Sequence, residues 1–296
     1  MKLILGTALW GWVVPKATCF EILDEFYKNN FRKIDTATNY PINKDNKYFR
    51  FAETIIEEWI SANGVNDLEI TIKVGSVDNS GSPVNNLTFS FLMMSQDYYL
   101  EKFESNVDTL MIHWDNRNSE ESISQSIRAL YTINKKVKVG LSGIKYPEIY
   151  YKYLKDNNII SSIQIKHNLF DSYYDKYKPF LGLSRFDAYG INAGGLKLNS
   201  KYTATSSASI RGITVSSYQS YLVNLQILIS NSKICNSFND ICMIYALNSP
   251  GLGGIISGTS SKGQIKETIN SFKHFLPLDT SKLYHDLLNF QENEEL

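Results

Sequence analysis

The sequence has only three cysteines, and neither sign of charge is in excess. Cys19, Cys235 and Cys242 are odd in number and stand in no Cys-x-x-Cys or metal-ligand spacing, which argues against a disulfide framework and a cysteine-based metal site. We expect them to be reduced thiols in the core of a cytoplasmic protein. The 30 basic and 30 acidic residues balance, so nothing indicates a surface for nucleic acid or for an anionic membrane.

Long hydrophobic runs are also absent. The N-terminal stretch MKLILGTALWGWVV is apolar, but Gly6, Thr7 and Gly11 interrupt it and no small-residue cleavage pattern follows. Because the stretch is too short to span a bilayer, we interpret it as a buried strand and not as a signal peptide or an anchor. The chain has 296 residues, 43% of them hydrophobic, which is enough for a substantial core.

The sequence does contain a regular alternation of short apolar runs and longer segments with helical spacing of apolar residues. Two segments rich in small and polar residues, the loop 75–94 and the stretch 192–217, are expected to be irregular. The expected strands are 2–7, 31–37, 68–75, 107–114, 136–143, 160–168, 184–191 and 251–258. The expected helices are 17–30, 50–64, 95–106, 119–134, 146–158, 172–181, 221–230, 238–248, 261–275 and 281–290.

This alternation predicts the fold. The strands are too continuously apolar for a sheet with one solvated face, and buried parallel strands have this composition. Eight strand–helix units, in a chain near the ~250 residues typical of the fold, predict a single (β/α)8 TIM barrel domain over residues 1–296. A doubly wound open sheet is the alternative, but the Gly-x-Gly-x-x-Gly turn that often follows its first strand is absent.

Polar residues stand at the C-terminal ends of the expected strands, where barrel enzymes place their chemistry. Taken singly, Asp35 would more often be a helix cap, Lys73 a strand-end lysine with its head in water, and His113 a hydrogen-bonded core residue. These separate readings do not predict an acid, an amine, an imidazole and the phenol of Tyr40 on three successive strand ends. The polar or small strand-end positions are Thr7, Asp35, Lys73, His113, Ser142, Gln164, Tyr189 and Gly258.

Six segments along the chain resemble, in order and spacing, the signature segments of the aldo-keto reductases. They are IDTATNY, ITIKVG, VDTLMIHWD, VGLSG, QIKHNLFD and GGIISGTSSKGQIKETI, and the likeness runs from residue 5 to about residue 272. The resemblance implies a (β/α)8 barrel that binds a nicotinamide dinucleotide at its C-terminal face without a Rossmann domain. It also implies reversible reduction of a carbonyl group by hydride transfer.

The resemblance implies a catalytic role for each of four residues. Reduction places charge on the carbonyl oxygen, so an acid must stand beside that oxygen. A phenol with a pKa near ~10 is a weak acid at neutral pH unless a nearby ammonium stabilises its anion. A carboxylate in turn keeps a buried ammonium charged. We therefore expect Tyr40 to be the general acid, Lys73 to tune it, and Asp35 to hold Lys73, while His113 orients the carbonyl oxygen.

The resemblance also implies contacts with both ends of the cofactor. Ser142 and Gln164 match the residues that hold the nicotinamide carboxamide, and Tyr189 matches the aromatic residue that stacks on the nicotinamide ring. The turn SGTSSKG matches the segment that binds the adenosine phosphate, where backbone N–H groups at a helix start attract an anion. The expected set is Gly6, Thr7, Ser142, Gln164, Tyr189, Gly190, Gly258, Thr259, Ser260, Lys262, Gln264 and Glu267.

The chain departs from the family pattern at the nicotinamide end and after the seventh strand. Gly143 stands where an Asn commonly follows the serine, which removes one contact to the carboxamide. Ile191 and Asn192 replace the usual Pro-Leu pair.

It departs again at the adenosine end. Ser260 stands where many NADPH-using members have an arginine, and Thr268 where an asparagine often meets the adenine. Lys262 and Lys266 offer positive charge instead. We expect NADP(H), with NAD(H) as the alternative, and no metal.

Tryptophans mark the expected substrate side. Trp10, Trp12 and Trp114 follow strand ends at the catalytic face, and aromatic walls commonly line small-molecule pockets. The alternative is that they pack loops onto the barrel rim. With the two irregular segments enclosing the site, we expect a small carbonyl substrate, such as one derived from a sugar.

Two other functions compete with carbonyl reduction. One is a barrel lyase or isomerase that uses Lys73 as a Schiff-base amine with His113 as its acid and base. Tyr40 and the segment QIKHNLFD argue against it. The other is a cofactor-binding regulatory protein with slow turnover, which the complete set of four catalytic residues argues against. The substrate, the favoured direction and the oligomeric state are left open.

Overall fold

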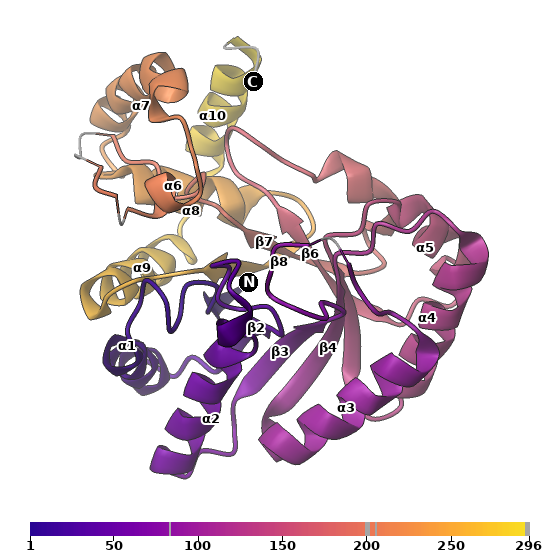
Figure 1. Ribbon diagram of the computed structural model, residues 1–296. Coiled ribbons are helices and arrows are strands. Elements are labelled where there is room, and N and C mark those ends of the chain that lie inside the picture. Colours follow the sequence, from indigo (N-terminus) through magenta and orange to yellow (C-terminus); the bar gives the residue numbers. More distant parts are fainter. Residues whose placement is uncertain (83, 199–201, 205, 294–296) are drawn as a thin grey trace.

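Eight parallel strands close into a barrel in the order in which they occur along the chain, as the sequence predicts. The structure is a computed structural model that describes residues 1–82, 84–198, 202–204 and 206–293. Figure 1 shows the strands at the centre with helices around them. The strands are β1 Lys2–Gly6, β2 Lys33–Ala37, β3 Glu69–Val74, β4 Val107–His113, β5 Lys138–Ser142, β6 Ile160–Lys166, β7 Arg185–Tyr189 and β8 Leu252–Ser257.

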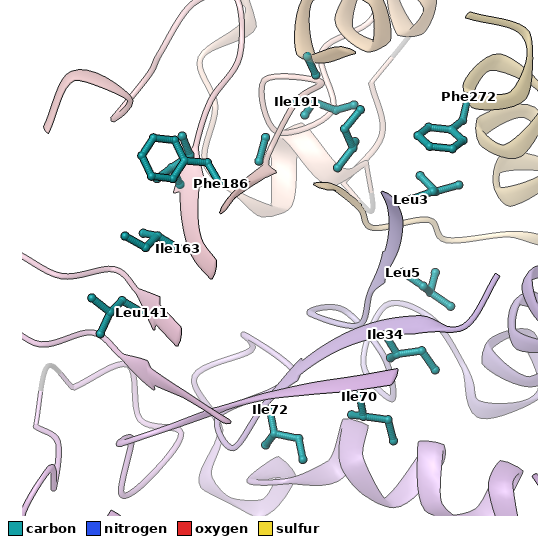
Figure 2. Close-up of a cluster of buried hydrophobic side chains, with 14 of the residues drawn as sticks. Leu3, Leu5, Ile34, Ile70, Ile72, Leu141, Ile163, Phe186, Ile191 and Phe272 are labelled. Carbon is teal, nitrogen blue, oxygen red and sulfur yellow. The ribbon is translucent and has the colours of Figure 1, made fainter. Parts of the chain in front are cut away.

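The two faces of the strands differ more than expected. Successive side chains of a strand point to opposite faces, and Figure 2 shows Ile70 and Ile72 on the same side of β3, in the apolar cluster. The alternate residues Thr71 and Lys73 therefore point into the barrel, and both are buried. Strand β3 is thus buried on both faces, but only its outer face is apolar. The inner face can carry polar groups to the catalytic end.

Helices follow the strands, and several begin at a capping side chain. Thr88, Ser119, Ser237 and Ser261 each accept a hydrogen bond from a backbone N–H of the first turn, which satisfies one of the unpaired donors there. The α-helices are α1 Lys16–Lys28, α2 Phe51–Asn63, α3 Phe89–Phe103, α4 Glu120–Ile133, α5 Pro147–Leu154, α6 Ser207–Ile210, α7 Gln219–Ser232, α8 Phe238–Asn248, α9 Lys262–Phe275 and α10 Ser281–Asn293. The short 3-10 helices are η1 Asn46–Tyr48, η2 Glu104–Asn106, η3 Asp175–Phe180 and η4 Val215–Tyr218.

The structure corrects the sequence prediction in three places. Helix α3 begins at Phe89 and not at residue 95, because Thr88 caps it; the loop after β3 is therefore 75–88, in which residue 83 lies outside the described residues. The segment 172–181 holds the 3-10 helix η3 and no α-helix, with Pro179 inside it, where a missing N–H disfavours the α-helix. The stretch 192–217 contains α6 and most of η4, and its residues 199–201 and 205 are not described.

Helices from the last third of the chain gather on one side of the barrel. Helix α8 contacts α7, α9 and α10, and Figure 1 shows α6, α7 and α10 together there, away from α3 and α4. The three cysteines are free and buried, with Cys19 in α1, Cys242 in α8 and Cys235 between α7 and α8. Within the described ranges, no helix is long and apolar enough to cross a membrane.

Candidate active site

A buried ion pair lies at the catalytic end of β2 and β3. Lys73 Nζ donates a hydrogen bond to Asp35 Oδ2, and each residue is only 2% exposed. Burial by itself lowers the pKa of Lys73, but the charge of Asp35 and the nearby Tyr40 outweigh burial, so the pKa is raised above its ordinary value. The amine is therefore a fixed positive charge in the neutral pH range.

Gln164 extends this pair across the barrel. Its Nε2 donates to Asp35 Oδ1, and its Oε1 accepts from Ser142 Oγ at 3.3 Å. Both carboxylate oxygens of Asp35 are thereby hydrogen-bonded, as a buried charge requires. Sequence reasoning treated Gln164 only as a cofactor contact. No sequence signal marks a bond between β6 and β2, because it depends on how the barrel closes.

Tyr40 stands beside Lys73, just after β2. Its backbone N–H donates to Ala37 O at 3.0 Å, its carbonyl accepts from Ala52 N at 3.2 Å, and Lys73 Nζ lies 4.8 Å from the centre of its ring. Burial raises the pKa of the phenol; Lys73 acts in the opposite, expected direction but does not cancel the effect of burial. Tyr40 therefore holds its proton at neutral pH, as a general acid must before it reacts.

His113 completes the group at the end of β4. Its ring is nearly perpendicular to that of Tyr40, with the ring centres 6.3 Å apart. Burial, and then the charge of Lys73, hold the pKa of His113 well below its usual range. Its Nδ1 is buried and has no hydrogen-bond partner among the described residues. The neutral ring carries one N–H, and in the Nε2-protonated tautomer that group can donate to a substrate oxygen.

Asn79 forms hydrogen bonds with the loop that follows Tyr40. Its Nδ2 donates to Pro41 O and to Asn43 Oδ1, both at 2.8 Å, and its backbone N–H donates to Asn46 Oδ1 at 2.8 Å. The side chain is almost fully buried. The loop after β3 therefore holds the loop after β2. Sequence reasoning missed Asn79, which is one of several asparagines in the polar stretch GSVDNSGSPVNN and carries no distinguishing signal.

The expected nicotinamide-end residues lie on neighbouring strand ends. Ser142 pairs with Gln164 in the β5–β6 register, and Tyr189 pairs with Lys166 in the β6–β7 register. Gly190 has a φ of 68°. Of the residues that the structure describes, a Cβ there would meet only Lys166, with Cγ at 4.0 Å, so they leave the space beside Gly190 open.

Gly6 and Thr7 lie at the end of β1. The Thr7 hydroxyl donates to Asp35 O at 3.0 Å and is fully buried. Its hydroxyl hydrogen is therefore already engaged within the barrel. Thr7 holds β1 against β2, close to the Asp35 carboxylate.

The residues expected to meet the adenosine end form a hydrogen-bonded turn at the start of α9. Ser260 donates to Gln264 Oε1 from its backbone N at 2.9 Å and from its hydroxyl at 3.0 Å, while Ser261 Oγ accepts from Gln264 N at 3.2 Å. Thr259 Oγ1 is buried without a partner in the described part of the chain. An unpaired hydroxyl beside a helix N-terminus suits an anionic phosphate.

Charged residues flank this turn. Gly258 precedes it, and Lys262 and Glu267 lie on α9. Lys266 Nζ is 3.8 Å from Glu25 Oε2, so part of its charge is offset. Lys262 is therefore the better placed of the two lysines to meet a phosphate at the helix start.

The three tryptophans do not share one environment. Trp10 is 1% exposed and part of the core, which fits the alternative that it packs its loop onto the barrel. The physical reason is a tight turn in which Gly11 N donates to Val14 O at 2.8 Å and folds the loop back onto the barrel. Trp12 and Trp114 are 41% and 37% exposed. In the described residues no cluster of three or more potential metal ligands is present.

Comparison with known proteins identifies the family and a similar fold. The model of the Aldo/keto reductase family matches residues 2–284. The chain is 27% identical over 156 residues to the norsolorinic acid reductase stcV of Emericella nidulans, and that match spans 47% of this chain but only 38% of the reductase. The fold is similar to that of the aldo-keto reductase AKR11C1 from Bacillus halodurans in its holo form, with a TM-score of 0.73, 17% identity, and coverage of 98% of this chain and 91% of that one. The family model covers nearly the whole chain and confirms the resemblance seen in the motifs: the chain belongs to the aldo/keto reductase family.

Proposed function

We propose that the protein is an NAD(P)H-dependent reductase that converts an aldehyde or ketone into an alcohol, with Tyr40 as the general acid. Family membership supports an oxidoreductase that uses a nicotinamide cofactor and a small carbonyl compound. The observation that carries the finer proposal is the buried Lys73 ammonium, held by Asp35 beside a protonated phenol and a neutral imidazole.

The reaction requires three things from the chain's own residues. The cofactor, when bound, supplies the hydride that reaches the carbonyl carbon. His113 donates a hydrogen bond to the carbonyl oxygen and orients it, and Tyr40 transfers its proton to that oxygen as negative charge develops there. Lys73 stabilises the resulting phenolate, and Asp35 and Gln164 hold Lys73 in place. Solvent then returns a proton to Tyr40, so that protons and electrons balance over the cycle.

The cofactor is proposed to be NADP(H), with NAD(H) as the alternative. The residues suit its two ends, because in the described part of the chain Ser142 and Gln164 keep unused acceptor sites for a carboxamide. In the same residues, Thr259 is a donor without a partner beside the α9 N-terminus. Lys262 is the proposed partner of the 2′-phosphate. Tyr189, beside the open space at Gly190, is the proposed stacking residue.

The substrate and the location of the protein are proposed on weaker structural grounds. Trp12 and the exposed part of Trp114 provide aromatic surface for a small carbonyl compound, such as a sugar-derived one. A cytoplasmic location is supported by three buried cysteines without a disulfide between them.

A Schiff-base mechanism is not favoured by the geometry. A nucleophilic lysine must lose its proton, usually through burial away from other charges. Lys73 is instead ion-paired with Asp35, and its pKa is raised. Borohydride trapping with carbonyl substrates would detect such an intermediate, and we expect none.

The test is steady-state oxidation of NADPH and NADH against a panel of aldehydes, ketones and keto-sugars. Replacing Tyr40 with Phe removes one oxygen while leaving Asp35 and Lys73 in place. General-acid catalysis contributes roughly 10²–10⁴ in rate, so turnover should fall at least that far. Cofactor affinity should stay nearly unchanged, because the phenol acts as charge develops. A Tyr40→Phe enzyme that keeps more than about a tenth of wild-type turnover would sink the assignment.

A further inference from the structure

Trp114 holds an unusual backbone conformation between the catalytic histidine and β5. Its φ is 58°, in the left-handed region that bulky residues rarely enter. Two hydrogen bonds fix it there: its N–H donates to Ser142 O at 2.9 Å, and its carbonyl accepts from Asn85 Nδ2 at 2.5 Å. The surrounding structure therefore imposes the direction in which the side chain leaves the backbone.

The indole is seated on Gly143. A Cβ added to Gly143 would lie 2.5 Å from Trp114 Cδ1 and 3.3 Å from Trp114 Nε1. The N–H edge of the indole therefore occupies the space that a side chain at position 143 would fill. The centre of the indole is also 4.5 Å from that of the His113 ring, with the planes inclined by 33°. Trp114 thus wedges between the ends of β4 and β5.

This position adjoins the proposed carboxamide site. Gly143 follows Ser142, whose hydroxyl bonds Gln164, and Gly143 itself offers no side-chain atom. We propose that Trp114 is a cofactor-positioning residue, an inference that rests on the proposed nicotinamide cofactor. The indole forms one wall of the nicotinamide pocket beside Ser142. Its Nε1–H is the hydrogen-bond donor that Gly143, which has no side chain, cannot provide. Trp114 therefore acts on the nicotinamide half of the cofactor, in addition to any contact with substrate.

Binding measurements can separate the two halves of the cofactor. The experiment titrates wild type, Trp114→Ala and Trp114→Phe by calorimetry with NADPH and with 2′,5′-ADP, which lacks the nicotinamide half. Trp12→Ala is the matched control, because Trp12 is similarly exposed but has no contact with Gly143. If wild type prefers NADH, the pair becomes NADH and ADP-ribose.

We expect Trp114→Ala to weaken NADPH binding roughly three- to tenfold, the range that loss of an aromatic contact gives. Affinity for 2′,5′-ADP should be unchanged, and Trp12→Ala should alter neither. Trp114→Phe keeps a ring but lacks the N–H, so it should give an intermediate loss. If Trp114→Ala raises only the KM for the carbonyl substrate, or weakens both ligands equally, the proposal is wrong.

A double-mutant comparison tests whether the indole of Trp114 packs on Gly143. Gly143→Ala should weaken NADPH binding in the wild-type background, because the methyl group meets the indole. In the Trp114→Ala background the same change should cost less, since only the backbone strain remains. Equal losses in both backgrounds would show that the indole does not rest on Gly143. Wild type that binds neither NADPH nor 2′,5′-ADP would overturn the proposed function itself, and this inference with it.

Discussion

The chemistry proposed for this protein depends on the charge of one buried amine, that of Lys73. Taking an ammonium and a carboxylate out of water costs several kcal/mol per ion unless both are well paired. Here Lys73 bonds one oxygen of Asp35 and Gln164 bonds the other. The amide also connects the carboxylate to Ser142, so one series of hydrogen bonds runs from Lys73 through Asp35 and Gln164 to a proposed cofactor contact.

Removing the amine should damage both folding and catalysis. Lys73→Met leaves Asp35 buried without its counter-charge, which typically costs about 3–5 kcal/mol. Turnover should collapse, because nothing then stabilises the Tyr40 phenolate. Combined with Tyr40→Phe, the loss in turnover should be far from additive, since both changes act through one proton transfer. Chemical denaturation and kinetics of the two single variants and the double variant measure this; additive kinetic losses would separate the two roles.

The choice between the two cofactors is proposed to rest on Lys262 at the start of α9. Reversing its charge with Lys262→Glu should weaken NADPH binding more than NADH binding, because only NADPH carries the 2′-phosphate. Lys266→Glu is the matched control, since Lys266 lies near Glu25. Titrations with both cofactors decide the point, and an equal loss for both would remove Lys262 as the phosphate partner.

At the residue scale, the sequence identified the polar side chains that the structure brings together, because rare residue types at strand ends need little context. Asp35, Lys73 and His113 are polar in otherwise apolar runs, and packing does not explain them. The bond from Gln164 to Asp35 depends on barrel closure. The burial of Trp10 depends on a four-residue turn. Neither leaves a periodic signal in the chain.

At the scale of elements, the loops at the catalytic end hold one another. Ile42 N donates to Ala8 O at 3.0 Å, Asn79 binds the loop after Tyr40, and Asn85 binds Trp114. The loops after β1, β2, β3 and β4 are therefore linked in series. This mutual support adds to the backbone bonds that join Tyr40 to Ala37 of β2 and to Ala52 of α2.

Asn79→Ala should test this support. The change leaves buried acceptors in the loop after Tyr40 without their donors, which costs about 1–3 kcal/mol for an unsatisfied group. Turnover should fall while cofactor affinity stays close to that of wild type. The control is Asn86→Ala, because among the described residues Asn86 Oδ1 bonds only the backbone and hydroxyl of Thr88. Asn79→Ala with normal turnover would show that Tyr40 is held by other contacts.

The elements that the sequence predicted poorly are those set by single residues. The strands were found because burial on both faces gives a strong apolar signal. The start of α3 was missed because FSFLMMS is apolar enough to be ambiguous between helix and strand, and the hydroxyl of Thr88 fixes the boundary. The segment 172–181 has a helix-like composition, but Pro179 limits it to a 3-10 turn.

At the scale of the whole molecule, two buried groups give the stability opposite dependences on pH. Burial lowers the pKa of His167 to about 4; its ring nitrogens contact Ser172 and Ser249 at 2.6 and 2.8 Å. Burial raises the pKa of Glu53 to about 7, against the opposing hydrogen bond from Tyr99 at 2.7 Å. As the pH falls, His167 therefore binds a proton at a higher pH in the unfolded chain than in the folded chain. As the pH rises, Glu53 stays protonated to a higher pH in the folded chain than in the unfolded chain.

The signs follow from these shifts. The contribution of His167 to the free energy of unfolding is fully present above its ordinary pKa of 6.5, and it is lost as the pH falls toward about 4. The contribution of Glu53 is present below 4.5 and is lost as the pH rises toward about 7. Each changes the free energy of unfolding by at most ~1.4 kcal/mol per pH unit. His167→Gln should therefore flatten the loss of stability on the acid side, and Glu53→Gln should steepen it.

Urea unfolding between about pH 5 and about pH 8 measures both slopes, with the denaturant m-value as the check that the unfolded states remain comparable. If His167→Gln keeps the full acid sensitivity of wild type, His167 is not the group responsible.

The three buried cysteines can report local unfolding of the elements that cover them. Burial raises the pKa of the Cys19 thiol to about 12, that of Cys235 to about 11, and that of Cys242 as well. Because the thiolate is the reactive form, alkylation in the folded state should be very slow. Labelling must then follow a local or global excursion that exposes each thiol. Mass spectrometry would thus measure the alkylation rate at each cysteine. The rate at Cys235 reports local unfolding of the α7–α8 connection, and the rate at Cys19 reports local unfolding of α1, without any introduced probe.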